Sequence, residues 1–172
     1  WNFFDANSKK SSIVKKECTK IIMKLPNWKE YTTLPLFEKI VKLLQKGIAF
    51  HHAGLPQIFR EMIEHLFDKG FVKILFATET FAVGINMPTK SVIFTSMKKF
   101  DGTSERFLLS HEYTQMAGRA GRRGLDTKGY VFHLINFYEK NNKLPSVTEF
   151  NQILCGKPQS LESKFSVDFN II

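Results

Sequence analysis

The stretch VKILFA at residues 72–77 decides the fold, because it is an unbroken apolar run apart from Lys73. A strand with one face in water alternates apolar and polar residues, whereas a strand covered on both faces is continuously apolar. This run therefore predicts a buried strand of a parallel sheet. Shorter runs at residues 48–50, 92–94 and 130–135 predict three more strands of the same kind.

Helical patterns separate these strands. Apolar residues recur every three or four positions in residues 12–25, 35–46 and 56–69, which is the period of an amphipathic helix. Strands that alternate with helices indicate an α/β fold, an open parallel sheet with helices on both faces.

Residues 98–107 differ from the rest and predict a short hairpin. Asp101-Gly102 is a favourable turn dipeptide, and the segments on either side of it each contain a phenylalanine. Beyond Asn136 the pattern becomes polar, so we expect a loop and a tail there.

The charge balance favours a polyanionic partner. The chain has 172 residues, 43% of them apolar, and its 25 basic and 16 acidic side chains give a formal charge of +9. Nucleic acid is a better match for this charge than a membrane surface, although a lysine-rich genomic composition gives the same excess. The arginines favour the functional alternative, because three of the five lie at positions 119, 122 and 123, and arginine recognises phosphate bidentately.

Cysteines and histidines give no sign of a metal site. Cys18 and Cys155 are far apart and share no ligand spacing, as in an intracellular protein of the nucleus or cytoplasm. His51-His52 lacks a second ligand pair, so we expect no metal; His52 and Gly54 instead predict a turn whose backbone contacts a ligand. No run approaches the roughly 20 apolar residues that span a bilayer, and we expect no membrane partner.

The segment QMAGRAGRRG at residues 115–124 carries the strongest chemical signal. Its three glycines permit close backbone approach and positive φ. Arg119 and Arg122 are three residues apart, so on a helical turn they would point the same way and grip adjacent phosphoryl oxygens. The alternative is an exposed Arg-Gly loop on an RNA backbone, but Gln115, four residues before Arg119, favours a catalytic motif.

A second polar segment follows the strand at residues 72–77. Thr78 and Thr80 offer hydroxyls and free backbone N–H groups suited to a phosphodiester, and Gly84 and Asn86 offer a tight turn and an amide. Capping of a short helix is the alternative role for such residues. We expect all three polar segments just beyond the carboxyl ends of strands, where open α/β sheets bind ligands.

In this order the three segments resemble motifs IVa, V and VI of superfamily-two helicases. The narrower similarity is to the superkiller-type, exosome-associated DExH RNA helicases. It rests on residues 50–55, 76–84, 94–102 and 112–115, with support from the tail, and the resemblance covers about residues 47–172.

This resemblance implies a domain organisation. Residues 1–140 are expected to form a second RecA-like helicase domain, and residues 141–172 a connector toward a winged-helix domain. The opening strand of the family is incomplete here, and residues 3–9 and 12–16 are alternative remnants of it.

The resemblance also assigns roles by matched position. Arg122 matches the arginine finger, Arg119 its companion on the phosphates, and Gln115 the residue that senses the γ-phosphate or its water. The positions that face the nucleotide are Gly84, Asn86, Gly118 and Gly121. The positions that hold the RNA strand are His52, Gly54, Thr78, Glu79 and Thr80. The hairpin falls where relatives carry a strand-separating pin, and we expect Phe100, Phe107 or both to stack on a base.

The 172 residues contain no Gly-x-x-x-x-Gly-Lys-Ser/Thr and no Asp-Glu-x-His. ATP and Mg²⁺ are therefore expected to be held mainly by the first RecA-like domain of the same full-length protein, and this domain alone is not expected to hydrolyse ATP. The implied partners are single-stranded RNA or an RNA duplex with an overhang, and an RNA-decay complex. DNA stays open, because related DNA helicases share the motifs. The rival hypothesis is a non-catalytic, basic RNA-binding module, which would have no need to keep the spacing from Gln115 to Arg122.

Overall fold

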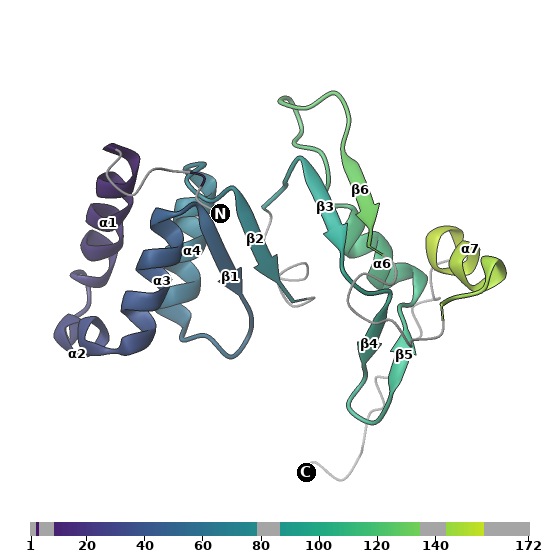
Figure 1. The fold of residues 1–172 in the computed structure, drawn as a ribbon, viewed down its shortest axis with the longest axis horizontal. Coiled ribbons are helices and arrows are strands. Elements are labelled where there is room, and N and C mark those ends of the chain that lie inside the picture. The colour runs from purple at the N-terminus through teal and green to yellow at the C-terminus, as the bar shows by residue number, and fades with distance from the viewer. Residues whose placement is uncertain (1–2, 4–8, 79–86, 135–143, 157–172) are drawn as a thin grey trace, which may run out of the picture. The chain divides into compact units, whose positions relative to one another are not determined.

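The computed structural model describes residue 3 and residues 9–78, 87–134 and 144–156, and it divides into two compact units at residues 87 and 88. We describe each unit by itself. The first unit comprises α1 (Lys9–Ile22), α2 (Trp28–Thr33), α3 (Pro35–Gln45), β1 (Ile48–His51), α4 (Gln57–Asp68) and β2 (Ile74–Ala77) (Figure 1). The second comprises β3 (Ser91–Phe94), β4 (Lys98–Phe100), β5 (Glu105–Phe107), α6 (Ser110–Ala117), β6 (Tyr130–His133) and α7 (Val147–Cys155).

The first unit packs its helices around a large apolar core. β1 and β2 pair in parallel, with Ile48 opposite Ile74, and α3 and α4 pack on β1. The core side chains of α4 recur at helical spacing, and Phe59 at its centre is fully buried. The rings of Tyr31 and Phe37 lie against Phe59, with centroids at 6.0 and 6.1 Å.

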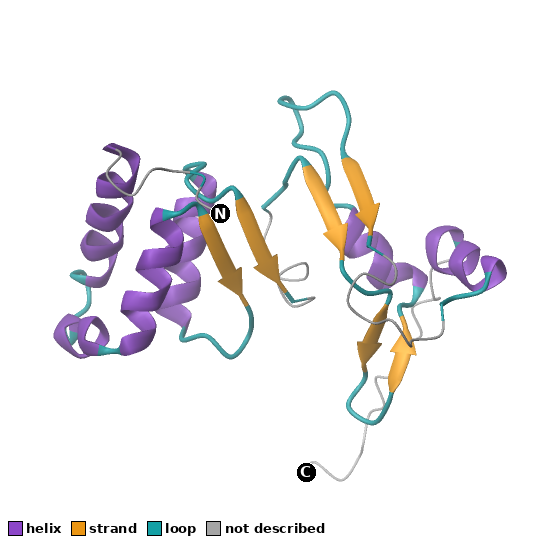
Figure 2. Ribbon diagram, in the orientation of Figure 1, coloured by secondary structure: helices purple, strands orange, loops and turns teal. Residues whose placement is uncertain are grey.

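The second unit contains two strand pairs, drawn in orange in Figure 2. β3 and β6 are parallel, with Ser91 opposite Tyr130. β4 and β5 form an antiparallel hairpin, with Phe100 opposite Glu105, and this hairpin projects beyond the end of the β3–β6 pair (Figure 1). Its core among the described residues is small and consists of Phe94, Met97, Leu108 and Ile153.

The predicted α/β class with parallel strands is confirmed, and so is the hairpin. The helices predicted at residues 12–25, 35–46 and 56–69 and the strands predicted at 48–50, 72–77, 92–94 and 130–135 are present within a few residues of these bounds. Residues 12–16, one alternative for the opening strand, lie in α1, so that alternative is wrong. The predicted burial of the strand at 72–77 is also wrong, because β2 is mostly exposed. Two helices were missed. α2 lies between the helices predicted at residues 12–25 and 35–46, where no element was predicted, and α7 lies where we predicted a loop and a tail.

Both missed helices have local causes. α2 has only six residues, and Trp28 and Tyr31 hold it because both pack against the core. α7 starts at a capping box: Ser146 Oγ accepts from Glu149 N at 3.2 Å and Glu149 Oε2 from Ser146 N at 2.8 Å. Reciprocal bonds of this kind satisfy N–H groups that a helix start otherwise leaves free.

Candidate functional site: the arginine loop and the strand-end loops

We define the arginine loop as residues 118–126. α6 ends at Ala117, and Gly118 N donates to Thr114 O at 2.8 Å in right-handed backbone with φ −65°. Gly121 then takes φ 93°. The premise that Arg119 and Arg122 share a helical turn is therefore wrong. The expected positive φ is confirmed for Gly121 and for Gly124, where it is 77°, but not for Gly118.

Two backbone hydrogen bonds pin the arginine loop to Thr89. Thr89 N donates to Arg119 O at 2.8 Å, and Gly121 N donates to Thr89 O at 2.7 Å. Thr89 comes three residues after Asn86 in the sequence. Gly84 and Asn86 themselves lie outside the described residues, and their nucleotide-facing role stays a prediction.

A pair of glycines makes this arrangement possible. Gly121 lies against Gly129, and a Cβ on Gly129 would meet Ala120 C and O at 2.5 Å. Such a distance is far inside van der Waals contact, so no side chain fits at position 129 while the loop stays on Thr89. Sequence reasoning selected Gly121 and missed Gly129.

The arginine loop lies at the amino ends of β3 and β6, because Thr89 precedes β3 and the loop leads into β6. The prediction of a position beyond carboxyl ends is therefore wrong for this segment. The reason is chain direction: a connection that leaves a helix and enters a strand meets the sheet at that strand's start.

Arg122 is held by a carboxylate that sequence reasoning missed. Arg122 Nε donates to Asp126 Oδ2 at 2.7 Å, and Nη2 donates to Oδ1 at 2.9 Å. Arg122 N adds a third bond, 3.1 Å to Oδ2. Hydrogen bonding from Arg122 lowers the pKa of Asp126 to about 2. The only signal in the sequence was the spacing of four residues between a basic and an acidic side chain.

This clamp occupies one edge of the guanidinium. The fork uses Nε–H and one N–H of Nη2, and a guanidinium has five N–H donors. Three donors, two on Nη1 and one on Nη2, therefore remain for a ligand. The side chain of Arg122 is 43% exposed, whereas that of Asp126 is 8% exposed. The carboxylate is therefore buried, and the three remaining N–H donors belong to a side chain that solvent reaches.

Arg119 and Gln115 contribute less defined geometry. Arg119 is half-buried and Gln115 is exposed at the last turn of α6. Their predicted contacts with the γ-phosphate stay predictions.

In the first unit, the two strand-end segments meet where β1 and β2 end. Thr78 N donates to His51 O at 3.2 Å, so this N–H extends the ladder and is not free, contrary to our prediction. The placement beyond carboxyl ends is confirmed for residues 51–55 after β1 and for Thr78 after β2. Glu79 and Thr80 lie outside the described residues, and their RNA contacts stay predictions.

The predicted turn at His52 is present, with its own internal hydrogen bond. Gly54 N donates to His52 Nδ1 at 3.1 Å. Gly54 N–H is thus satisfied within the turn. An imidazole that accepts at Nδ1 carries its proton at Nε2 when neutral, which leaves His52 Nε2–H to donate outward. Its neighbour His51 is buried, and its Nε2 lies 2.8 Å from Glu64 Oε1.

The hairpin presents one of its two phenylalanines. Phe100 is 64% exposed, whereas Phe107 packs on the small core and Lys98 Nζ lies 5.6 Å from its ring centroid. At the tip, Asp101 Oδ1 accepts from Thr103 N and Ser104 N, each at 2.9 Å. Phe100 is therefore the exposed one of the two rings, and its stacking on a base stays a prediction.

A second carboxylate, Glu112, joins the hairpin to α6. It accepts two bonds from Arg106 of β5, at 2.8 and 2.9 Å, and one from Lys99 of β4 at 3.0 Å. It also accepts from Leu109 N at 2.8 Å, which caps the helix. Hydrogen bonding from Arg106 lowers the pKa of Glu112 to about 2. Sequence reasoning used this residue only as a match to the family.

Within the described ranges, no group of three or more His, Cys, Asp or Glu is placed to hold a metal ion. Within the same ranges, none of the helices combines the length and apolar character needed to cross a bilayer.

Comparison with known proteins agrees with this geometry. The model of the helicase conserved C-terminal domain matches residues 8–124, and the chain belongs to this family. The resemblance to superkiller-type DExH helicases is confirmed by three similar relatives. Antiviral helicase SKI2 of Saccharomyces cerevisiae is 47% identical over 96% of this chain and 12% of its own length. Superkiller complex protein 2 of Homo sapiens is 45% identical over 81% of the chain and 11% of its own length. Exosome RNA helicase MTR4 of Homo sapiens is 48% identical over 81% of the chain and 13% of its own length.

The chain thus spans about an eighth of the length of these relatives. Their names describe whole proteins, and this chain matches only part of each.

Proposed function

We propose that this chain acts as the second motor domain of an ATP-dependent RNA helicase and supplies Arg122 to an ATP site completed by a first RecA-like domain. The observation that carries the proposal is the one-edged clamp on Arg122. Asp126 holds the guanidinium in place, and the remaining donors are left for an anion.

The described residues fit a phosphate better than they fit Mg²⁺. Bidentate N–H donors match phosphoryl oxygens, whereas Mg²⁺ prefers carboxylate oxygens, and Asp126 already uses both of its oxygens on Arg122. Mg²⁺ therefore belongs mainly to the first domain. When bound, ATP supplies the phosphoryl group that is transferred to water.

Arg122 then acts by differential binding. Its open edge donates to phosphoryl oxygens only when the two motor domains close, so its interaction is stronger in the transition state than in the open enzyme. That difference is the condition for raising turnover. Because Asp126 fixes the guanidinium in advance, little side-chain freedom is lost at closure.

We infer that the bound strand is RNA, because relatives such as MTR4 are named as RNA helicases. His52 Nε2–H and the Thr78 hydroxyl, on adjacent strand ends of the first unit, support contacts to a strand backbone. Such contacts hold a strand without reading its sequence. DNA is compared with RNA as the stimulating strand in the ATPase assay below.

The test is RNA-stimulated ATPase of the full-length helicase with Arg122→Ala. We expect turnover to fall by about 10³-fold or more, as for other arginine fingers, while RNA affinity stays within about twofold. Arg122→Lys should not restore turnover, since an ammonium cannot form the fork. Arg123→Ala, at an exposed neighbouring position, is the matched control and should keep most activity.

The clamp requires one further variant. Arg122→Ala leaves the largely buried Asp126 carboxylate without its partner, which can disturb folding by itself. Arg122→Ala with Asp126→Asn removes that charge, and it should be folded and equally inactive. If either variant keeps ATPase but loses RNA binding, the arginine loop grips RNA and the rival, non-catalytic module is the better description.

A further inference from the structure

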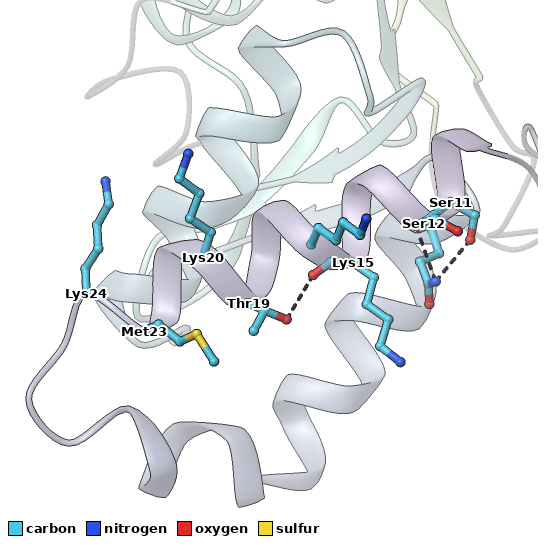
Figure 3. Close-up of a pocket in the computed structure, with 9 residues that line it drawn as sticks. Ser11, Ser12, Lys15, Thr19, Lys20, Met23 and Lys24 are labelled. Atoms are coloured by element: carbon cyan, nitrogen blue, oxygen red, sulfur yellow. Dashed lines mark hydrogen bonds between the residues drawn. The ribbon is translucent and has the colours of Figure 1, made fainter.

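A hollow lined by lysines lies on α1, away in sequence from the arginine loop and the strand-end loops. It is an open hollow of about 790 Å³, and Figure 3 shows the side chains that line it. It is lined by residues of α1, by Met23 and Lys24 just after α1, and by Gln45 at the end of α3. Its four basic residues are Lys15, Lys16, Lys20 and Lys24, and no aspartate or glutamate lines it. We call it the lysine groove.

None of these four ammonium groups forms an ion pair with a carboxylate in the described part of the chain. The one acidic residue of α1 is engaged elsewhere: Glu17 Oε2 binds Lys69 Nζ of the α4 C-terminus at 2.6 Å and lies 3.6 Å from His65 Nε2. α1 therefore has one face that is internally neutralised and one face that carries an excess of positive charge.

This charge pattern works against the stability of the helix. Lys16 and Lys20 are four residues apart on α1, and like charges at this spacing destabilise a helix by about 0.2–0.5 kcal/mol. α1 also has no acidic residue in its first turn, where the helix dipole favours one. Positions where local preference is violated are expected at functional sites.

The groove presents a row of charge with hydroxyls beside it. Lys16 and Lys20 are one helical turn apart, roughly 6 Å at 1.5 Å per residue, and Lys24 follows in the turn just after α1. Thr19 lies between Lys16 and Lys20 in the sequence, and its hydroxyl donates to Lys15 O at 3.0 Å. The end of the groove is fixed by buried Ser11, whose Oγ accepts from Gln45 Nε2 at 3.0 Å.

The lining chemistry distinguishes between classes of partner. Protein interfaces are depleted in lysine and depend on aromatic or arginine anchors, and the groove has neither. Its one large apolar side chain is Met23. Single-stranded nucleic acid is held on aromatic rings that stack with bases, and no ring lines the groove. Double-helical RNA, by contrast, is held through phosphates and 2′-hydroxyls without stacking.

We propose that the lysine groove binds the sugar–phosphate backbone of double-helical RNA. Lys16, Lys20 and Lys24 neutralise successive phosphates along one strand, and the hydroxyl-bearing side chains accept from 2′-hydroxyls. The site reads no sequence, since every contact is to the backbone. It is separate from the strand-end loops, which contact the translocated strand in the proposed function.

The test is binding of this 172-residue chain to a blunt RNA duplex, followed by fluorescence anisotropy over a series of salt concentrations. Lys16→Gln/Lys20→Gln/Lys24→Gln should weaken binding about tenfold or more. It should also reduce the slope of log K against log salt by about 2 to 3, near one for each phosphate that is no longer neutralised. Lys39→Gln/Lys46→Gln/Lys73→Gln is the matched control. It removes three exposed lysines of the same unit and should change the slope by less than about 1.

Folding is controlled by a charge-preserving variant. Glutamine has nearly the same helix propensity as lysine, and Lys16→Arg/Lys20→Arg/Lys24→Arg should keep wild-type affinity. Equal weakening by both glutamine variants would mean a response to net charge alone and would overturn the proposal. Loss of single-strand binding with duplex binding intact would also overturn it. Loss of poly-glutamate binding with RNA binding intact would assign the groove to an acidic protein partner instead.

Discussion

The two units of the chain are stabilised by different means. Among the described residues, the first unit buries thirteen apolar residues in one cluster, whereas the second buries four. The second unit instead contains two carboxylates, Glu112 and Asp126, that each hold an arginine bidentately. Apolar packing is non-directional, while a bidentate pair fixes orientation. The unit that aims a guanidinium in the proposed function is thus the one held by directional contacts.

The largest expected effect on stability comes from a substitution in the apolar core of the first unit. Phe59→Ala removes a fully buried ring at the centre of the first unit and should lower the free energy of unfolding by about 3–5 kcal/mol. Denaturant unfolding followed by fluorescence of Trp28 measures it, since residues 88–172 contain no tryptophan. Phe100→Ala, which truncates a ring that is 64% exposed, should cost less than about 0.5 kcal/mol. Similar losses of unfolding free energy in the two variants would contradict the view that apolar burial stabilises mainly the first unit.

Next in size is the loss of the larger carboxylate cluster. Glu112→Gln removes the charge that Arg106 and Lys99 share, and bonds to charged groups contribute about 1.5–3 kcal/mol. We expect the variant to be less stable by about 2 kcal/mol, seen in hydrogen exchange as faster exchange of β4, β5 and the start of α6. Glu105→Gln is an exposed control in the same hairpin. Unchanged exchange in the hairpin of the Glu112 variant would show that the cluster does not hold it.

Acid should destabilise the second unit at a higher pH than the first. The pKa values of Glu112 and Asp126 are lowered to about 2 from ordinary values of 4.5 and 3.8. A carboxyl with a lowered pKa stabilises the fold fully above its unfolded-state value, and this stabilisation is lost as pH falls through the folded value. Between about pH 4.5 and 2, the second unit should lose exchange protection before the first. Loss of Trp28 fluorescence at higher pH than loss of hairpin protection would reverse the comparison.

The smallest effect is chemical and leaves stability unchanged. Burial raises the pKa of Cys18 to about 12, so its thiolate is scarce at neutral pH, and the thiolate is the reactive form. Cys155 is exposed. Iodoacetamide should label Cys155 rapidly in the native protein and Cys18 only after unfolding, as peptide mass spectrometry can resolve. Equal labelling of both would mean that the first unit opens readily.

Periodicity predicted much of the fold because α3 and α4 bury apolar side chains at helical spacing. The strands were predicted from apolar runs, although β2 is mostly exposed. α7 was missed although its signal was present, since the Ser146 and Glu149 capping box precedes apolar residues at helical spacing. α2 was missed because two aromatic anchors in six residues are too few to show a period.

The candidate site was less accessible to sequence reasoning. The residue types at Arg119 and Arg122 indicated phosphate chemistry, but not where the loop lies. Its position follows from bonds to Thr89, thirty residues away from Arg119 in the sequence, and such long-range contacts have no local signature. Asp126 lies close in sequence, yet its pairing requires the turn that Gly121 and Gly124 make. Our prediction of a helical turn at these residues did not include that turn.

The contact between Gly121 and Gly129 has a consequence for genetics. A methyl group at position 129 would wedge against the Ala120 carbonyl at 2.5 Å and push the arginines away from their anchor. In a saturation-mutagenesis screen of helicase activity, position 129 would therefore tolerate nothing but glycine and would rank beside Arg122. Yet Gly129 has no side chain to offer a ligand. Position 129 would be intolerant because the neighbouring loop fills the space that a side chain would need. A screen alone would therefore assign a catalytic role to a residue whose role is steric.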